Sequence, residues 1–276
     1  MRQANRKGRQ RIVSLAPSAT SILVALGVGR DLVGVTRWCT EVVPAGKLPL
    51  RQTRLGDCWS LDPEHVVKLR PTLVIGSVPY KQETVARLLE NPLTFLAMNP
   101  RTLADIEADI RLLGRIVGRT IAAKRLVARM RQGFAEIRQK SSNAESTEAQ
   151  RTRRKSLRVY CEAWPHPRIS SPPWVGELVE IAGGRMVVPA GQRVSDAEIA
   201  RARPDIIVIA WAGTGARPRN TATLANPAWQ DVPAVRQRRV YVVRDELLNT
   251  PGPPLVEGAR ELCRIFHSNG APSVTC

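Results

Sequence analysis

The sequence predicts an α/β protein with two Rossmann-like lobes, each built on a parallel sheet, and a single long backbone helix that joins them. Three observations predict this fold: strands alternate with helices, one strand–helix pattern occurs twice, and a long amphipathic stretch separates the two copies. The chain has 276 residues, 43% hydrophobic and 24% charged, so it can bury one large core or two ordinary ones. No apolar run approaches the roughly 18–20 residues that span a bilayer, so we expect no membrane insertion.

Residues 11–29, RIVSLAPSATSILVALGVG, follow a basic start and could form either a secretory signal peptide or the first strand and helix of a domain. A signal peptide needs an uninterrupted apolar core and a small-residue cleavage site. Serine, threonine and proline residues interrupt this run, and no Ala-x-Ala site follows. We therefore predict a strand at 12–15 and a helix from about Ala19 that stops at Gly27. This interpretation predicts a cytoplasmic protein, with a periplasmic location as the alternative if the translation start is misassigned.

The repeat supports two lobes of similar plan. Residues 61–77, LDPEHVVKLRPTLVIGS, and residues 194–211, VSDAEIARARPDIIVIAW, both indicate a capped short helix, a proline and a buried strand. Asp62 and Ser195 stand at the N-cap positions, each nine residues before the proline. Because parallel strands of an open sheet end at one edge, the two lobes predict a ligand cleft at the carboxyl ends of their strands.

Two helices are predicted between the lobes. Apolar residues spaced by three and four indicate one helix over residues 103–117 and a second over residues 120–139. A helix of about 20 residues spans ~30 Å, so the second helix could join the lobes as one rod. The predicted organisation is a basic tail (1–10), an N-terminal lobe (11–100), the helical segment (101–139), a flexible loop (140–156), a C-terminal lobe (157–267) and a tail (268–276).

The net charge of +18 has a local origin. Much of the excess comes from two basic runs, at residues 2–11 and 151–158, without interleaved aromatic residues and without a known nucleic-acid motif. We interpret both runs as solvated basic surface and expect no nucleic-acid partner. A polyanion-binding surface protein is the alternative, and it predicts a steep salt dependence of binding.

Aromatic residues follow several predicted strands at their carboxyl ends. Such side chains would line the cleft and offer flat apolar walls to a large, partly apolar ligand. The candidates are Trp38, Trp59, Tyr80, Trp164, Trp174 and Trp211.

No catalytic motif accompanies these residues. The sequence has no nucleophile elbow, dinucleotide fingerprint or Walker loop, and we predict that the protein is not an enzyme. A tetrapyrrole chelatase, which needs residues that take pyrrole protons, is a weaker alternative with only Glu162 and His166 available. Three of the five cysteines, Cys39, Cys58 and Cys161, fall in predicted cleft loops, where they are either a soft metal site or, as we prefer, small buried thiols.

Several ordered motifs resemble one family. RIVSLAPSATSILVALGVGRDLVGVTRWC, LDPEHVVKLRPTLVIGS, NPRTLADIEADIRLLGRIVG, ISSPPWVGELVEIAGG and RVYVVRDELLNTPGPPLVEGARELCRIFH together resemble the helical-backbone (cluster III) substrate-binding proteins of ABC importers for cobalamin, haem and ferric siderophores. The resemblance covers about residues 11–267 and is greatest to the cobalamin-binding branch.

The resemblance implies a monomer that binds a corrinoid and docks to an ABC permease, with no cofactor of its own. Trp and Tyr side chains would hold the ligand with polar help from Ser18, Thr20 and Asn249. An iron complex, haem or a ferric siderophore, is the alternative ligand, and Arg37 would then meet its negative charge. The family has one docking acid on each lobe. These positions match Glu64 and Ala197, so in the second lobe the flanking Asp196 and Glu198 are the candidates.

Overall fold

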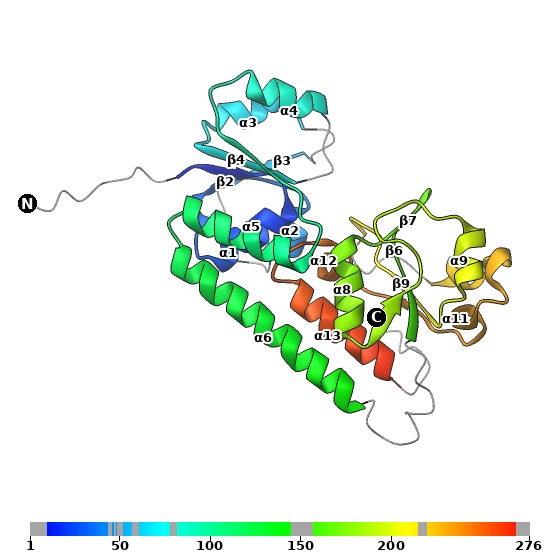
Figure 1. The fold of residues 1–276 in the computed structure, drawn as a ribbon. Coiled ribbons are helices and arrows are strands. Elements are labelled where there is room, and N and C mark those ends of the chain that lie inside the picture. The colour runs from blue at the N-terminus through cyan, green and yellow to red at the C-terminus, as the bar shows by residue number, and fades with distance from the viewer. Residues whose placement is uncertain are drawn as a thin grey trace, which may run out of the picture. The chain divides into compact units, whose positions relative to one another are not determined.

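A computed structural model of the chain describes residues 10–43, 46, 48, 52–56, 61–77, 82–144, 157–214 and 220–268. Its internal contacts divide the chain into two compact units. Lobe 1 comprises residues 1–100 and 104–127, and lobe 2 comprises residues 101–103 and 128–276. Both lobes are α/β units (Figure 1).

Lobe 1 contains a five-stranded sheet in the order β3-β2-β1-β4-β5, in which every pairing is parallel. Its strands are β1 (Ile12–Ser14), β2 (Leu32–Thr36), β3 (Thr53–Leu55), β4 (Leu73–Ser77) and β5 (Phe95–Met98). Its helices are α1 (Pro17–Ala25), the 3₁₀ turn η1 (Gly29–Asp31), α2 (Cys39–Val42), α3 (Pro63–Lys68), α4 (Gln82–Leu89) and α5 (Leu103–Ile116). Helices α3 and α4 cover one face of the sheet, and α1 and α5 cover the other (Figure 1). Because both faces are covered, the central strands β1 and β4 consist of buried apolar residues until each ends in a serine.

The predicted first strand and helix are confirmed. Ile12 and Val13 in β1 are completely buried, as are Ile22 and Leu23 in α1. Helix α1 begins at Pro17, two residues earlier than predicted, because proline at the first helical position lacks only an N–H that would be unpaired there. Residues 12–25 therefore belong to the folded core.

Lobe 2 contains a sheet in the order β10-β9-β6-β7, and β8 also pairs with β6. Its strands are β6 (Leu157–Pro165), β7 (Arg168–Ser170), β8 (Gly184–Met186), β9 (Ile206–Ile209) and β10 (Val240–Val242). All pairings are parallel except β6 with β7. Strand β7 is antiparallel because it follows β6 after a tight turn, and only antiparallel strands can be joined by so short a connection. The sequence pattern did not predict this hairpin.

The helices of lobe 2 form two groups. They are α8 (Pro173–Ile181), α9 (Asp196–Ala202), α10 (Thr221–Leu224), the 3₁₀ turn η2 (Pro227–Trp229), α11 (Pro233–Arg236), α12 (Glu246–Asn249) and α13 (Leu255–His267). Residues of α9, η2 and α11 share a core cluster with β6, β9 and β10, in which Trp229 is fully buried. Helices α8 and α13 contact each other, and neither contributes a residue to this cluster.

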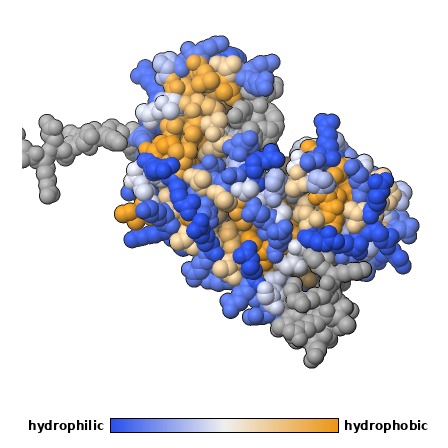
Figure 2. Space-filling model, in the orientation of Figure 1, coloured by the Kyte–Doolittle hydropathy of each residue, from blue (hydrophilic) through white to orange (hydrophobic). Residues whose placement is uncertain are grey.

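Helix α6 (Thr120–Ala144) is the long helix that the sequence predicts. Its residues up to Val127 belong to lobe 1, and the remainder belongs to lobe 2. The predicted apolar face is buried: Leu126, Met130, Phe134 and Ile137 are all less than a tenth exposed. Hydrophilic side chains line much of α6 on the face drawn in Figure 2.

Helix α6 continues beyond residue 139, where the sequence predicted a flexible loop. Ser141 is buried on the same helical face, and its hydroxyl lies 3.1 Å from Nε2 of His267 in α13. The contact with α13 accompanies the extension of α6 to Ala144, although the polar residues there favour a loop.

The structure confirms both predicted helix caps. The Asp62 carboxylate accepts a hydrogen bond from the backbone N–H of Glu64, and the Ser195 hydroxyl accepts one from the N–H of Glu198. The two helices also end alike, because Arg70 and Arg203 both adopt the left-handed conformation directly before a proline.

Replacing Ser195 by alanine is expected to lower the free energy of unfolding by about 1 kcal/mol, because the first turn of α9 loses its cap. Urea denaturation measures this effect. Ser195→Asp is the matched control, since aspartate also caps helices and should retain most of the stability. Equal losses in both variants would contradict a capping role for this hydroxyl.

Candidate functional site

Polar side chains meet at the carboxyl ends of β1 and β2 in lobe 1. The Thr20 hydroxyl donates a hydrogen bond of 2.8 Å to the Ser14 hydroxyl, and both side chains are fully buried. The Thr36 hydroxyl lies 3.1 Å from the Cys39 sulfur, which also lies 3.8 Å from the Ser14 carbonyl oxygen. This cluster joins β1, β2 and the first turns of α1 and α2. Its members bond to one another, so their first role is to hold this edge of the sheet.

The candidate residues of lobe 1 differ in exposure. Arg37 is exposed and stacks over the half-buried Trp38, with the guanidinium carbon 4.3 Å from the ring centroid. Ser18, in the first turn of α1, is only 3% exposed. Trp59 and Tyr80 lie outside the described residues. Trp38 and Arg37 are therefore the described candidates of lobe 1 with the most accessible side chains.

Lobe 2 brings three candidates to the carboxyl ends of β6 and β9. The chain stays beside β6 after β9 ends, since the Ala212 N–H donates to the Ala163 carbonyl oxygen within β6 at 3.0 Å. Trp164 is 43% exposed, and Trp211 is half-buried. The Asn249 amide donates to the Ala210 carbonyl oxygen at 2.6 Å, while its buried Oδ1 has no hydrogen-bond partner among the described residues. This edge therefore presents two indoles, with the Asn249 side chain buried beside them.

Trp174 has a different environment. It lies in the first turn of α8, is 9% exposed, and donates from Nε1 to the Leu248 carbonyl oxygen at 2.8 Å. Its contacts are those of a residue that seals α8 onto the segment before Asn249.

A buried carboxylate lies beneath the lobe 2 edge. Glu162 is 1% exposed and accepts hydrogen bonds from Trp211 Nε1, from the Tyr160 hydroxyl and from Arg168 Nη1, each at 2.8 Å. Burial first, and then the charge and hydrogen bond of Glu162, raise the pKa of the Tyr160 hydroxyl, which stays protonated. His166 does not join this group: its carbonyl oxygen accepts from Trp164 Nε1.

Sequence reasoning missed Arg168. The available signal was the charge of Glu162 inside an otherwise apolar buried strand, which requires a cation nearby. No spacing rule identified the cation, because the β6–β7 hairpin that delivers it was not predicted.

The described cysteines are buried thiols. Cys39 and Cys161 are both 0% exposed, and they lie in different lobes. Burial raises the pKa of both thiols, that of Cys161 to about 12, so both are neutral at pH 7. Cys58 lies outside the described residues. Within the described ranges, no group of three or more His, Cys, Asp or Glu residues could hold a metal ion.

The candidate docking acids have different surroundings. Glu64 is exposed in the first turn of α3 and lies 4.0 Å from Lys68 Nζ. In α9, Asp196 pairs with Arg168, and Glu198 accepts hydrogen bonds from the backbone and side chain of Ser195. These bonds lower the pKa of Glu198. Both acids of α9 thus have intramolecular partners.

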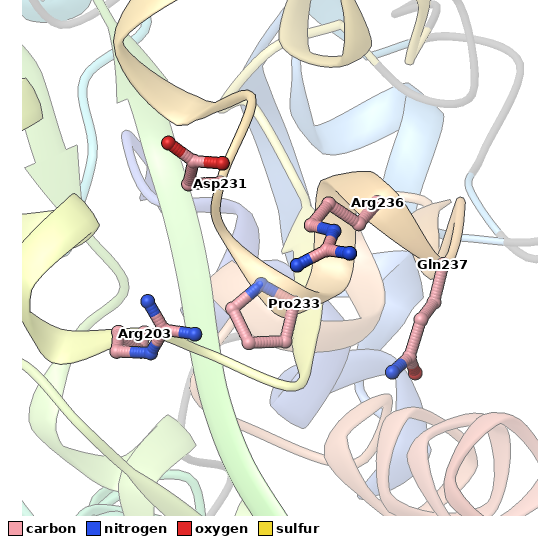
Figure 3. Close-up of a pocket in the computed structure, with 5 residues that line it drawn as sticks. All are labelled: Arg203, Asp231, Pro233, Arg236 and Gln237. Atoms are coloured by element: carbon pink, nitrogen blue, oxygen red, sulfur yellow. The ribbon is translucent and has the colours of Figure 1, made fainter.

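A surface pocket of about 360 Å³ lies at the opposite, amino end of β9. Figure 3 shows the side chains of Arg203, Asp231, Arg236 and Gln237 around it, together with Pro233. None of the candidate ligand-binding residues lines this pocket.

The structure thus combines two α/β lobes, the long helix α6 and aromatic side chains at the carboxyl edges of the sheets, where open α/β sheets bind their ligands. A family model described as "Periplasmic binding protein" matches residues 12–247, and the chain belongs to this family.

Relatives define the class further. The chain is 27% identical over 273 residues to the uncharacterized ABC transporter substrate-binding lipoprotein YvrC of Bacillus subtilis, covering 95% of this chain and 81% of that protein. It is 25% identical over 265 residues to the vitamin B12-binding protein of Pectobacterium carotovorum, covering 92% and 87%. Among solved structures, the apo form of the periplasmic heme-binding protein RhuT of Roseiflexus sp. RS-1 matches with a TM-score of 0.76 and 26% identity, covering 94% and 98%. The chain is a solute-binding protein of the ABC-importer type.

The prediction of a cytoplasmic protein is wrong. The family comprises periplasmic and lipoprotein binding proteins of ABC importers, which work outside the cytoplasm. The error lay in taking the fold of residues 12–25 as evidence of compartment: these residues belong to the domain, whichever side of the membrane the domain occupies. Within the described residues, no helix is long and apolar enough to cross a membrane.

Proposed function

We propose that this protein binds a corrinoid, of the cobalamin type, for delivery to an ABC permease. The observation that carries the proposal is the alignment of 92% of the chain with the Pectobacterium vitamin B12-binding protein. A cobalamin-binding protein of Halobacterium salinarum also aligns, over 94% of the chain at 24% identity.

The side chains at the carboxyl edges support a ligand of this kind. Trp164 and Trp211 in lobe 2, and Trp38 in lobe 1, offer flat apolar surfaces that suit a large macrocycle. Asn249 stays a proposed polar contributor, although its Oδ1 is buried in this structure and would have to become accessible to accept a hydrogen bond from a ligand. Trp59, Tyr80, Ser18 and Thr20 remain proposed contributors. Trp174 is buried and bonds to the Leu248 carbonyl oxygen, so we propose that it holds α8 in place and does not contact the ligand.

Haem is the second candidate ligand, because the heme-binding protein RhuT matches over almost its whole length at 26% identity. An anionic iron complex, haem or a ferric siderophore, would draw on Arg37, whose guanidinium is exposed beside Trp38.

We further propose that the exposed Glu64 docks to a basic site on the permease, with Asp196 and Glu198 as the acids of lobe 2. Glu64 lies 4.0 Å from Lys68 Nζ, whereas Asp196 and Glu198 make much shorter bonds to Arg168 and Ser195, so we expect them to contribute less to docking than Glu64.

Isothermal titration of the purified chain with cyanocobalamin tests the ligand assignment, with haemin and a ferric siderophore titrated in parallel. We expect saturable one-to-one binding of cyanocobalamin. Binding of haemin or the siderophore alone would replace the corrinoid by an iron complex. Absence of binding to all three would reject both candidates.

A further inference from the structure

One carboxylate in lobe 2 is shared between the proposed ligand edge and the interior. Oε1 of Glu162 accepts from the Trp211 indole, and Oε2 accepts from Arg168 and Tyr160. Trp211 follows β9 at the carboxyl edge, whereas Glu162 is almost completely buried. The orientation of the Trp211 ring is therefore set by a buried anion.

Arg168 carries this connection further. Its Nη1 donates to Glu162, and its Nε donates to Oδ1 of Asp196 at 2.5 Å. Its guanidinium also stacks over the Trp229 ring, 4.3 Å from the centroid. Although burial disfavours the charged form, the bonds to Glu162 and Asp196 raise the pKa of Arg168, so it remains a cation. The planar fork of a guanidinium can hold two carboxylates in fixed directions, which a lysine cannot do.

The far end of the connection is helix α9. Asp196 is the first residue of α9, and its backbone carbonyl oxygen accepts from Trp229 Nε1 at 3.2 Å. Trp229 is 0% exposed and fixes this turn against the core. Three hydrogen bonds, two of them ion pairs, thus link Trp211 to the first turn of α9 through Glu162 and Arg168.

We propose that Arg168 is a positioning residue that couples the Trp211 indole to the first turn of α9. Charge-assisted bonds in a buried network depend on one another, because a group that loses its partner keeps the full cost of its desolvation. A ligand that moves the Trp211 ring therefore changes the restraint on Asp196, and a change at Asp196 in turn alters the affinity for the ligand. The ligand part of this proposal rests on the proposed function, but the connection between Trp211 and α9 does not.

The connection is tested in the ligand-free protein by the indole N–H resonance of Trp211 in ¹H–¹⁵N spectra, assigned with Trp211→Phe. Asp196→Asn is expected to shift this resonance, because the bonds that join Asp196 to the Trp211 indole run through Arg168 and Glu162. Arg168→Lys, which keeps the charge but not the fork, should shift it as well. Asp231→Asn is the matched control, because Asp231 is an exposed acid outside the network, and it should leave the resonance in place. An unshifted resonance in both Asp196→Asn and Arg168→Lys would overturn the proposal. The side chain of Asp196 is 44% exposed, so we expect its variant to fold.

Affinity for cyanocobalamin tests the functional consequence. Asp196→Asn should weaken binding about fivefold or more, and Asp231→Asn should not. In the Trp211→Phe background, which lacks the indole N–H, the effect of Asp196→Asn should disappear. An effect that persists in that background would overturn the coupling, because a general structural role does not depend on the indole. If the unmodified protein binds no cyanocobalamin, the ligand assignment fails, and the resonance of Trp211 still decides the connection.

Discussion

Glu162→Ala is expected to lower the free energy of unfolding by about 3–5 kcal/mol. The substitution leaves Arg168 with a largely buried positive charge that, among the described residues, Asp196 alone still pairs, and it removes the acceptor of Tyr160 and Trp211. The cost is large because desolvated polar groups without partners cannot return to water in the folded state. Urea denaturation followed by far-ultraviolet circular dichroism measures the loss.

Glu257→Ala is the matched control for this prediction. Glu257 forms a 3.1 Å ion pair with Arg260 on α13, and both side chains are more than half exposed. Exposed pairs contribute about 0.5 kcal/mol or less, because water screens the charges. Similar losses in the two variants would contradict a structural role for the buried Glu162 network.

Trp38→Ala and Trp164→Ala are each expected to weaken cyanocobalamin binding by about 30-fold, which corresponds to about 2 kcal/mol. Each substitution removes a flat apolar surface from the carboxyl edge of one lobe. Trp164 is 43% exposed and Trp38 is half-buried, so the fold should tolerate truncation better than at Trp174 or Trp229. Calorimetric titration gives the affinity, and circular dichroism checks the fold.

Ile121→Ala and Leu89→Ala control for the loss of an exposed apolar side chain. Ile121 is 68% exposed and Leu89 is 58% exposed, and neither follows a strand at its carboxyl end. Both variants should bind like the unmodified protein. Unchanged affinity in the two tryptophan variants would exclude Trp38 and Trp164 from the ligand site.

Sequence patterns predicted the structure correctly where the determining contacts lie within a few residues of one another. The caps at Asp62 and Ser195 could be predicted because an N-cap side chain bonds a backbone N–H only two or three residues away. The buried face of α6 followed from helical spacing alone. Trp38 and Trp211 could be placed at carboxyl edges because each stands two residues after its strand. Trp164, also predicted to follow a strand, lies within β6 near its end.

Such patterns could not predict the cellular compartment, since a domain with a folded first helix can work on either side of a membrane. The extension of α6 to Ala144 also had no local signal, because its polar end is held by His267, far away in the sequence.

By itself, the sequence determined the two α/β lobes, the long helix and the places of Trp38, Trp174 and Trp211 along the elements, because periodicity and capping act over a few residues. Only the tertiary structure decided which candidates are accessible and which are sealed. It turned Trp174 inward, left Trp164 exposed, and brought Arg168 between Glu162 and Asp196. The reason is physical: a buried charge needs an opposite charge, and in this chain the β6–β7 hairpin and the packing of α9 supply it.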